Sequence, residues 1–116
     1  MIFVFGSNTQ GRHGKGAAKY ALDYHGAIYG QSEGMQGSSY GIITKNISGK
    51  GNKVSLEDIG VSVYKFMDFA KNNQNLKFNV TKIGCGLAGF TEVDIMKLFK
   101  GAPNNVILPD GWNPNA

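Results

Sequence analysis

Short apolar runs and amphipathic segments alternate along this chain, and glycine-rich stretches separate them. The apolar runs, which we expect to be strands, are residues 2–5, 40–44, 77–83 and 105–108. The amphipathic segments, which we expect to be helices, are residues 15–24, 55–71 and 91–100. This alternation predicts an α/β fold with a mainly parallel sheet. A length of 116 residues fits one domain, placed at residues 1–108, with residues 109–116 as a C-terminal tail.

The segment 55–71 carries the clearest helical pattern. Its apolar residues recur at spacings of three and four and so share one helical face: Leu56, Ile59, Val63, Phe66 and Ala70. Ser55 followed by Asp58 resembles an N-capping arrangement. Thr91 followed by Asp94 repeats that arrangement before the last predicted helix, and Gly101 is expected to end it.

Glycine and positive charge are concentrated in the same half of the chain. Residues 1–54 hold 11 of the 17 glycines, and they carry six basic and two acidic residues. Residues 55–116 carry six of each, so the whole net charge of +4 lies in the first half. This combination favours an anionic ligand that backbone amides contact. Nucleic acid is a less favoured partner, because only Arg12 among the 12 basic residues offers a forked guanidinium and no basic run reaches five.

Several classes of protein are excluded or disfavoured by composition. The chain has one cysteine, Cys85, which excludes an intramolecular disulfide and a cysteine zinc cluster. No apolar run approaches the roughly 18 residues of a membrane helix, and residues 1–5 are too short for a signal peptide. We therefore expect a protein of the reducing cytoplasm, the host cytoplasm if a phage encodes it, with no membrane partner, no metal and no cofactor.

Two glycine loops follow the first and third predicted strands, at residues 6–14 and 84–89, and each leads into a helix. If the four predicted strands stand in the order 2-1-3-4, both loops open at the switch point of the sheet, where ligands bind in open α/β folds. Helix N-termini aimed there suit a phosphate or pyrophosphate. Residues 84–89 read G-x-G-x-x-G, but they follow the third strand and not the first, which argues against a redox dinucleotide fold. The alternative is that these glycines only form tight turns.

The motifs and their order resemble the macrodomain superfamily, over about residues 2–108. The resemblance rests on Phe5-Gly6-Ser7-Asn8, Gly14-Lys15-Gly16-Ala17-Ala18, Tyr40-Gly41-Ile42-Ile43-Thr44-Lys45 and Ile83-Gly84-Cys85-Gly86-Leu87. The last two are similar to the branch that removes ADP-ribose from carboxylate side chains. The resemblance implies a three-layer α/β/α sandwich and a site for ADP-ribose or a related nucleotide. It also implies that Lys45 is the nucleophile of that branch and that the amides of Cys85 to Phe90 hold a diphosphate.

Taken together, the two loops and the resemblance define a candidate ligand-binding set: Gly6, Ser7, Asn8, His13, Gly14, Lys15, Gly16, Ala17, Gly84, Cys85, Gly86, Leu87, Ala88, Gly89 and Phe90. The hydrolase branch has an acid where this chain has Ala88, and Asp94 or Glu33 would have to replace it. We therefore expect a module that binds ADP-ribose or a cyclic or modified relative, and that could sequester a nucleotide signal.

Other functions remain open at this point. The first alternative is an ADP-ribosyl hydrolase that uses Lys45, and the second is a nucleic-acid-binding or structural module. Cys85 could instead be a nucleophile with His13 or His25 as its base. Trp112 is expected to pack either on the body of the domain or on a second subunit of a homo-oligomer.

Overall fold

A five-stranded mixed sheet forms the centre of the fold in a computed structural model, which describes residues 1–46, 54–85 and 90–115. The strands are β1 (Ile2–Asn8), β2 (Gly34–Gln36), β3 (Ser39–Lys45), β4 (Phe78–Val80) and β5 (Val106–Ile107). Their order across the sheet is β2-β3-β1-β4-β5. β1 pairs in parallel with β3 and β4, and β4 pairs in parallel with β5.

The sheet differs from the expected one at one edge. β2 lies antiparallel to β3, so the sheet is mixed and has five strands, and its order differs from the four-strand order 2-1-3-4 by this added strand. Within the observed order, the four predicted strands keep their relative places. The sequence pattern predicted no strand between the helix at residues 15–24 and the strand at residues 40–44, and that prediction is wrong for Gly34–Gln36.

Gln36 explains why a loop-like composition forms a strand here. Its side chain is buried, accepts a hydrogen bond from Ile28 N at 2.9 Å and donates to Gln31 O at 3.2 Å. Gly37, with φ of +61°, makes the tight return to β3 that a residue with a Cβ would resist. These contacts are with residues five and eight positions away, and secondary-structure propensity does not include such side-chain hydrogen bonds.

β1 is also longer than predicted, because it continues through Gly6, Ser7 and Asn8. The prediction ended this strand at Phe5, since Gly-Ser-Asn is typical of loops. In the folded protein Gly6 and Ser7 pair with Ile42 and Ile43 of β3, and an irregularity follows between Ser7 and Asn8. Because β1 pairs with β3 through these polar residues, it extends as a strand to the carboxyl-terminal end of the sheet.

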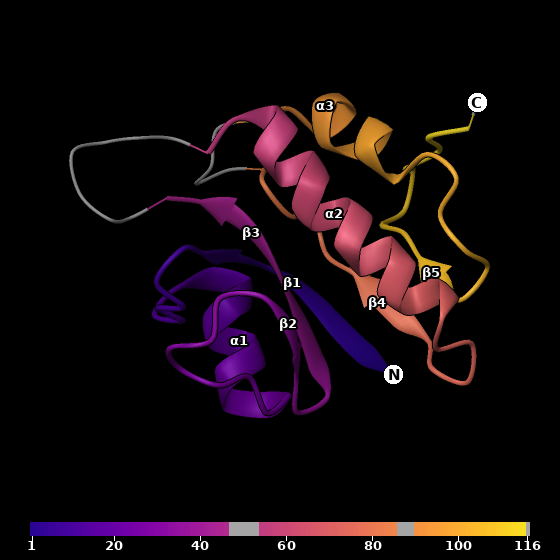
Figure 1. Cartoon of the computed structure of the whole chain (residues 1–116). Coiled ribbons are helices and arrows are strands. Elements are labelled where there is room, and N and C mark those ends of the chain that lie inside the picture. The colour runs from indigo at the N-terminus through magenta and orange to yellow at the C-terminus, as the bar shows by residue number, and fades with distance from the viewer. Residues whose placement is uncertain (47–53, 86–89, 116) are drawn as a thin grey trace.

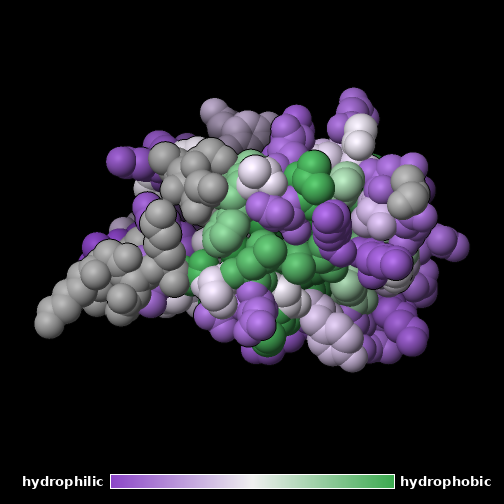
Figure 2. All heavy atoms as spheres, turned by 90° about the horizontal axis from the view of Figure 1, so that it is seen from above, coloured by the Kyte–Doolittle hydropathy of each residue, from purple (hydrophilic) through white to green (hydrophobic). Residues whose placement is uncertain are grey.

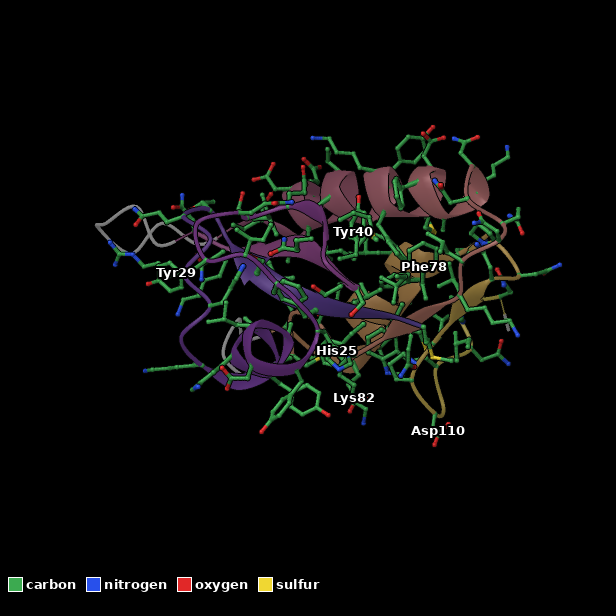
Figure 3. All side chains as sticks on the ribbon, turned by 90° about the horizontal axis from the view of Figure 1, so that it is seen from below. His25, Tyr29, Tyr40, Phe78, Lys82 and Asp110 are labelled. Atoms are coloured by element: carbon green, nitrogen blue, oxygen red, sulfur yellow. The ribbon has the colours of Figure 1, made fainter. Side chains whose placement is uncertain are left out.

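The helices lie on both faces of the sheet (Figures 1 and 3). They are α1 (Gly16–Tyr24), α2 (Leu56–Lys71) and α3 (Glu92–Met96), with a 3₁₀ turn at Lys97–Phe99. α1 packs against Phe3 and Phe5 of β1 through Ala18 and Ala21. α2 and α3 pack on the other face against a larger core, which includes Ile2, Val4, Tyr40, Ile42, Phe66, Phe78 and Phe99. Alternate residues of β1 thus face the two layers, as the strand period requires.

The C-terminal segment packs on the body of the domain. Trp112 is 8% exposed, its ring centroid lies 6.0 Å from that of Phe99, and its Nε1 donates to Glu92 Oε1 at 3.0 Å. Seen from above, apolar residues gather in the middle of one face within a hydrophilic surround (Figure 2). α2 and α3 carry the exposed side chains of Val61 and Val93. No helix in the described part of the chain is long and apolar enough to cross a membrane.

Candidate functional site

A cavity of about 830 Å³ opens where β1, β3 and β4 end. It brings together ten residues of the predicted site: Gly6, Ser7, Asn8, Gly14, Lys15, Gly16, Ala17, Lys45, Gly84 and Cys85. The chain leaves β1 for α1 on one face of the sheet and leaves the neighbouring β4 for α3 on the other. The cavity therefore lies at the switch point, the position expected for a ligand in this type of sheet.

Sequence reasoning missed part of the lining, namely Arg12, Ala18, Tyr29, Thr44, Thr81, Lys82 and Ile83. Arg12 lies within the first glycine loop, Ala18 directly follows Ala17, and Lys82 and Ile83 precede the second loop. Treating each loop together with its flanking residues would have found these four. Tyr29 carries no such signal, because it reaches the cavity from the segment between α1 and β2.

Four cationic side chains line the cavity, and the described lining contains no carboxylate. Lys82 forms an ion pair with Glu92 outside the lining, at 3.2 Å. For Arg12, Lys15 and Lys45, the described residues provide no carboxylate within ion-pair distance. Positive charge without local neutralisation creates an electrostatic potential that attracts anions into the cavity.

The N-terminus of α1 adds backbone donors to this charge. Lys15 occupies the N-cap position in extended conformation, with no side-chain cap, and the first turn of α1 contains no acidic residue. A Cβ placed on Gly14 or Gly16 would meet no atom within 4 Å, so the helix start borders open space. The first N–H groups of a helix and the positive end of its dipole together favour an anion.

Asn8 lines the cavity, but its side chain is already engaged. Its Oδ1 accepts from Arg12 N at 2.9 Å and from Gln10 N at 3.3 Å, and its Nδ2 donates to Arg12 O at 2.8 Å. These bonds close the loop between β1 and α1 on itself. The structure therefore gives Asn8 the role of fixing the loop that presents Arg12, Gly14 and Lys15.

His13 does not reach the cavity lining, although its neighbours do. The side chain is fully buried, and its Nε2 lies 3.0 Å from Gln31 O and 3.1 Å from Gln36 Oε1. Both partners are acceptors, so Nε2 carries the proton. The prediction that His13 contacts a ligand directly is replaced by a structural role, in which it ties the loop after β1 to the segment before β2.

The second glycine loop is described only at its two ends. Gly84 has φ of +73°, and a Cβ there would lie 2.7 Å from Ile95 Cδ1, so glycine is required for close contact with α3. Phe90 donates its N–H to Gly84 O at 3.2 Å and packs against the larger core, outside the cavity lining. The predicted ligand residues Gly86, Leu87, Ala88 and Gly89 lie outside the described residues.

Cys85 is poorly suited to act as a nucleophile. Burial raises the pKa of its thiol above the ordinary value of 9.0, Glu92 raises it further and Lys82 opposes the shift. The thiol is therefore protonated at neutral pH, whereas nucleophilic attack needs the thiolate. Its Sγ donates to Ile83 O at 3.5 Å.

The described lining of the cavity contains no Asp, Glu or His side chain to act as a general acid or base. Glu33, a possible replacement for the acid missing at position 88, accepts from Ser62 Oγ at 2.7 Å and lies 3.4 Å from Lys65 Nζ. Neither Glu33 nor Asp94 lines the cavity. Among the described residues, no group of three His, Cys, Asp or Glu side chains could hold a metal ion. The charge of this lining and the uncapped start of α1 are features that can hold an anion.

No protein-family model, curated protein or solved structure matches this chain. The likeness to macrodomains therefore remains a prediction from short motifs, and the functional argument depends on the cavity itself.

Proposed function

We propose that this protein binds the diphosphate of ADP-ribose, or of a related cyclic or modified adenine nucleotide, in the cavity at the ends of β1, β3 and β4. The observation that carries this proposal is a lining with four cations, no carboxylate among its described residues and an uncapped helix N-terminus. A diphosphate satisfies all three features at once, because it accepts backbone hydrogen bonds and neutralises the lysines. In a cell, such a module would sequester its nucleotide.

The fold and its size are compatible with this ligand. Helices on both faces of the sheet support a macrodomain-like three-layer arrangement, in which the ligand lies across the strand ends. A cavity of about 830 Å³ also falls within the range of small-molecule sites.

Binding without efficient turnover is the form of the proposal that the lining favours. A lysine amine attacks only when neutral, and the departing group must receive a proton. Lys45 lies in the lining, but none of the described lining residues is the Asp, Glu or His that most often performs these tasks. A hydrolase that uses Lys45 is the alternative, and it would need a proton donor from outside this set.

Calorimetry with ADP-ribose, AMP and a short oligonucleotide tests the proposal directly. We expect ADP-ribose to bind most tightly, and Lys15→Ala to weaken it by about 1–2 kcal/mol, or roughly 5- to 30-fold, because a partly desolvated ammonium contact is lost. Lys71→Ala removes the same charge at the end of α2, outside the cavity lining, and should change nothing. Tight, steeply salt-dependent binding of the oligonucleotide alone would establish a nucleic-acid module instead.

An ADP-ribosyl release assay separates binder from enzyme. We expect wild-type protein to release ADP-ribose from glutamate-modified protein slowly or not at all. Rapid release that disappears in Lys45→Ala would contradict the binder and make Lys45 catalytic. If Lys45→Ala alters neither release nor affinity, Lys45 contributes neither to catalysis nor to binding.

A further inference from the structure

Tyr29 is an exposed aromatic side chain in the wall of the cavity. It is 60% exposed and lines the cavity beside the strand ends. Figure 3 shows Tyr29 at one end of the molecule, away from Tyr40 and Phe78, which lie toward α2. The exposed Tyr20, Tyr24 and Tyr64 lie outside the cavity lining, so Tyr29 is distinguished from them by its place.

The backbone around Tyr29 is held firmly. Gly30 N donates to Gly11 O at 2.8 Å, Gln31 N donates to Ile28 O at 3.0 Å, and Ile28 N donates to Gln36 Oε1 at 2.9 Å. The bond from Gln31 to Ile28 closes the turn that contains Tyr29, and the bond from Ile28 to Gln36 attaches this turn to β2. A ring presented on a fixed turn loses little conformational freedom when it contacts a ligand.

His13 supports the ring of Tyr29 from inside the protein. The two ring centroids lie 6.3 Å apart with an interplanar angle of 71°, an edge-on contact. The His13 ring is itself fixed by its Nε2 bonds to Gln31 O and Gln36 Oε1. The buried histidine therefore acts as a positioning residue behind an aromatic surface.

Arg12 also lines the cavity, and its backbone lies close to that of Tyr29. The hydrogen bond between Gly11 and Gly30 joins the residue before Arg12 to the residue after Tyr29, and both side chains line the cavity. Arg12 is the only arginine in the chain, and it has no ion-pair partner among the described residues. A planar guanidinium can stack on a flat aromatic group, in addition to its ability to pair with a phosphate.

We infer that Tyr29 and Arg12 form the subsite for the nucleobase, while the start of α1 receives the phosphates. This inference rests on the proposed function and adds the residues that select a nucleotide over a simple phosphate compound. Aromatic stacking accepts any base, so the subsite would favour ligands with a base without choosing among bases.

The test compares ADP-ribose with inorganic pyrophosphate, which has the phosphates and no base. Tyr29→Ala should weaken ADP-ribose about tenfold or more and change pyrophosphate less than twofold, because only the base meets the ring. Tyr29→Phe should retain the wild-type affinity. Arg12→Lys keeps the charge and removes the planar group, so it should also weaken ADP-ribose more than pyrophosphate. Tyr64→Ala, which removes a tyrosine 69% exposed on α2, is the matched control.

Nuclear magnetic resonance supplies a second measurement on the same complexes. Stacking on Tyr29 should shift the adenine ring protons upfield in the wild-type complex, and Tyr29→Ala should abolish that shift. Equal losses of both ligands in Tyr29→Ala, or adenine shifts that survive it, would overturn the inference and leave the proposed function intact. If wild-type protein binds neither ligand, the proposed function fails and the inference fails with it.

Discussion

The N-terminus of α1 differs from those of α2 and α3, although all three helices begin after the carboxyl end of a sheet strand. Ser55 caps α2 by accepting from Asp58 N at 3.1 Å, and Thr91 caps α3 by accepting from Asp94 N at 3.2 Å. Both helices carry two acidic residues in the first turn. α1 has neither a side-chain cap nor an acid there, and a lysine stands at its cap position.

The starts of α2 and α3 therefore contribute to the stability of the protein, whereas the start of α1 is available to bind a ligand. A cap contributes about 1 kcal/mol, and acidic residues in the first turn neutralise the positive end of the helix dipole. At α2 and α3 the cap engages one of these donors, and the acidic side chains of the first turn would repel an anion. At α1 these donors remain open toward the cavity, and contacts of the preceding loop, made by Asn8 and Gly11, hold the helix start in place of a cap.

The largest expected effect comes from the loop that replaces the cap. A Cβ at Gly11 would lie 2.4 Å from the carbonyl carbon of Gly30, and φ is +66°. Gly11→Ala should therefore lower the free energy of unfolding by about 3 kcal/mol or more. Gly14→Ala is the control, because its Cβ would meet no atom within 4 Å. Equal urea midpoints for the two variants would show that the loop does not hold α1.

Introducing a side-chain cap at the start of α1 should weaken ligand binding and leave the stability of the protein equal or slightly higher. Lys15→Asp introduces a capping carboxylate at a position already in extended conformation, so stability should stay equal or rise by up to about 1 kcal/mol. The same carboxylate would occupy the amides and repel a phosphate, so ADP-ribose affinity should fall at least about 30-fold. Lys77→Asp, outside the cavity lining, makes the same charge change and should leave affinity unaltered. Unchanged affinity in Lys15→Asp would exclude the start of α1 from the site.

Removing the cap of α2 should give the reverse result. Ser55→Ala leaves the amide of Asp58 without its acceptor, and the free energy of unfolding should fall by about 1 kcal/mol. ADP-ribose affinity should not change, and Ser55→Asp should restore stability. A loss of affinity in a folded Ser55→Ala protein would mean that the two helix starts are not independent.

The smallest expected effect concerns the first turn of α3 at acidic pH. The hydrogen bond from Trp112, followed by the contact with Lys82, lowers the pKa of Glu92 below its ordinary value of 4.5. A lowered pKa in the folded state gives stability that is present above the unfolded pKa and is lost as pH falls through the folded value. Urea unfolding at pH 7 and pH 3.5 should therefore show a slightly larger acid-induced loss for wild type than for Glu92→Gln. Identical losses would show that this carboxylate does not anchor Trp112.

Local sequence patterns by themselves determined much of this protein. α2 occupies Leu56–Lys71 with Ser55 as its cap, as its apolar spacing predicts, and Thr91 caps α3 as expected. The four predicted strands occur, with shifted ends, and ten predicted site residues meet in one cavity. Helical periodicity, capping and glycine turns depend on residues close in the chain, so they can be recognised from the sequence without a structure.

Only the tertiary structure decided the remaining features, because each depends on particular backbone and side-chain partners that no periodic pattern of the sequence specifies. β2 forms because β3 pairs with it and Gln36 finds buried hydrogen-bond partners, although its composition is that of a loop. His13 became a buried support and not a ligand contact once Gln31 and Gln36 surrounded it. Tyr29 lines the cavity because Gly30 N donates a hydrogen bond to Gly11 O, a contact across 19 positions that no local pattern predicts.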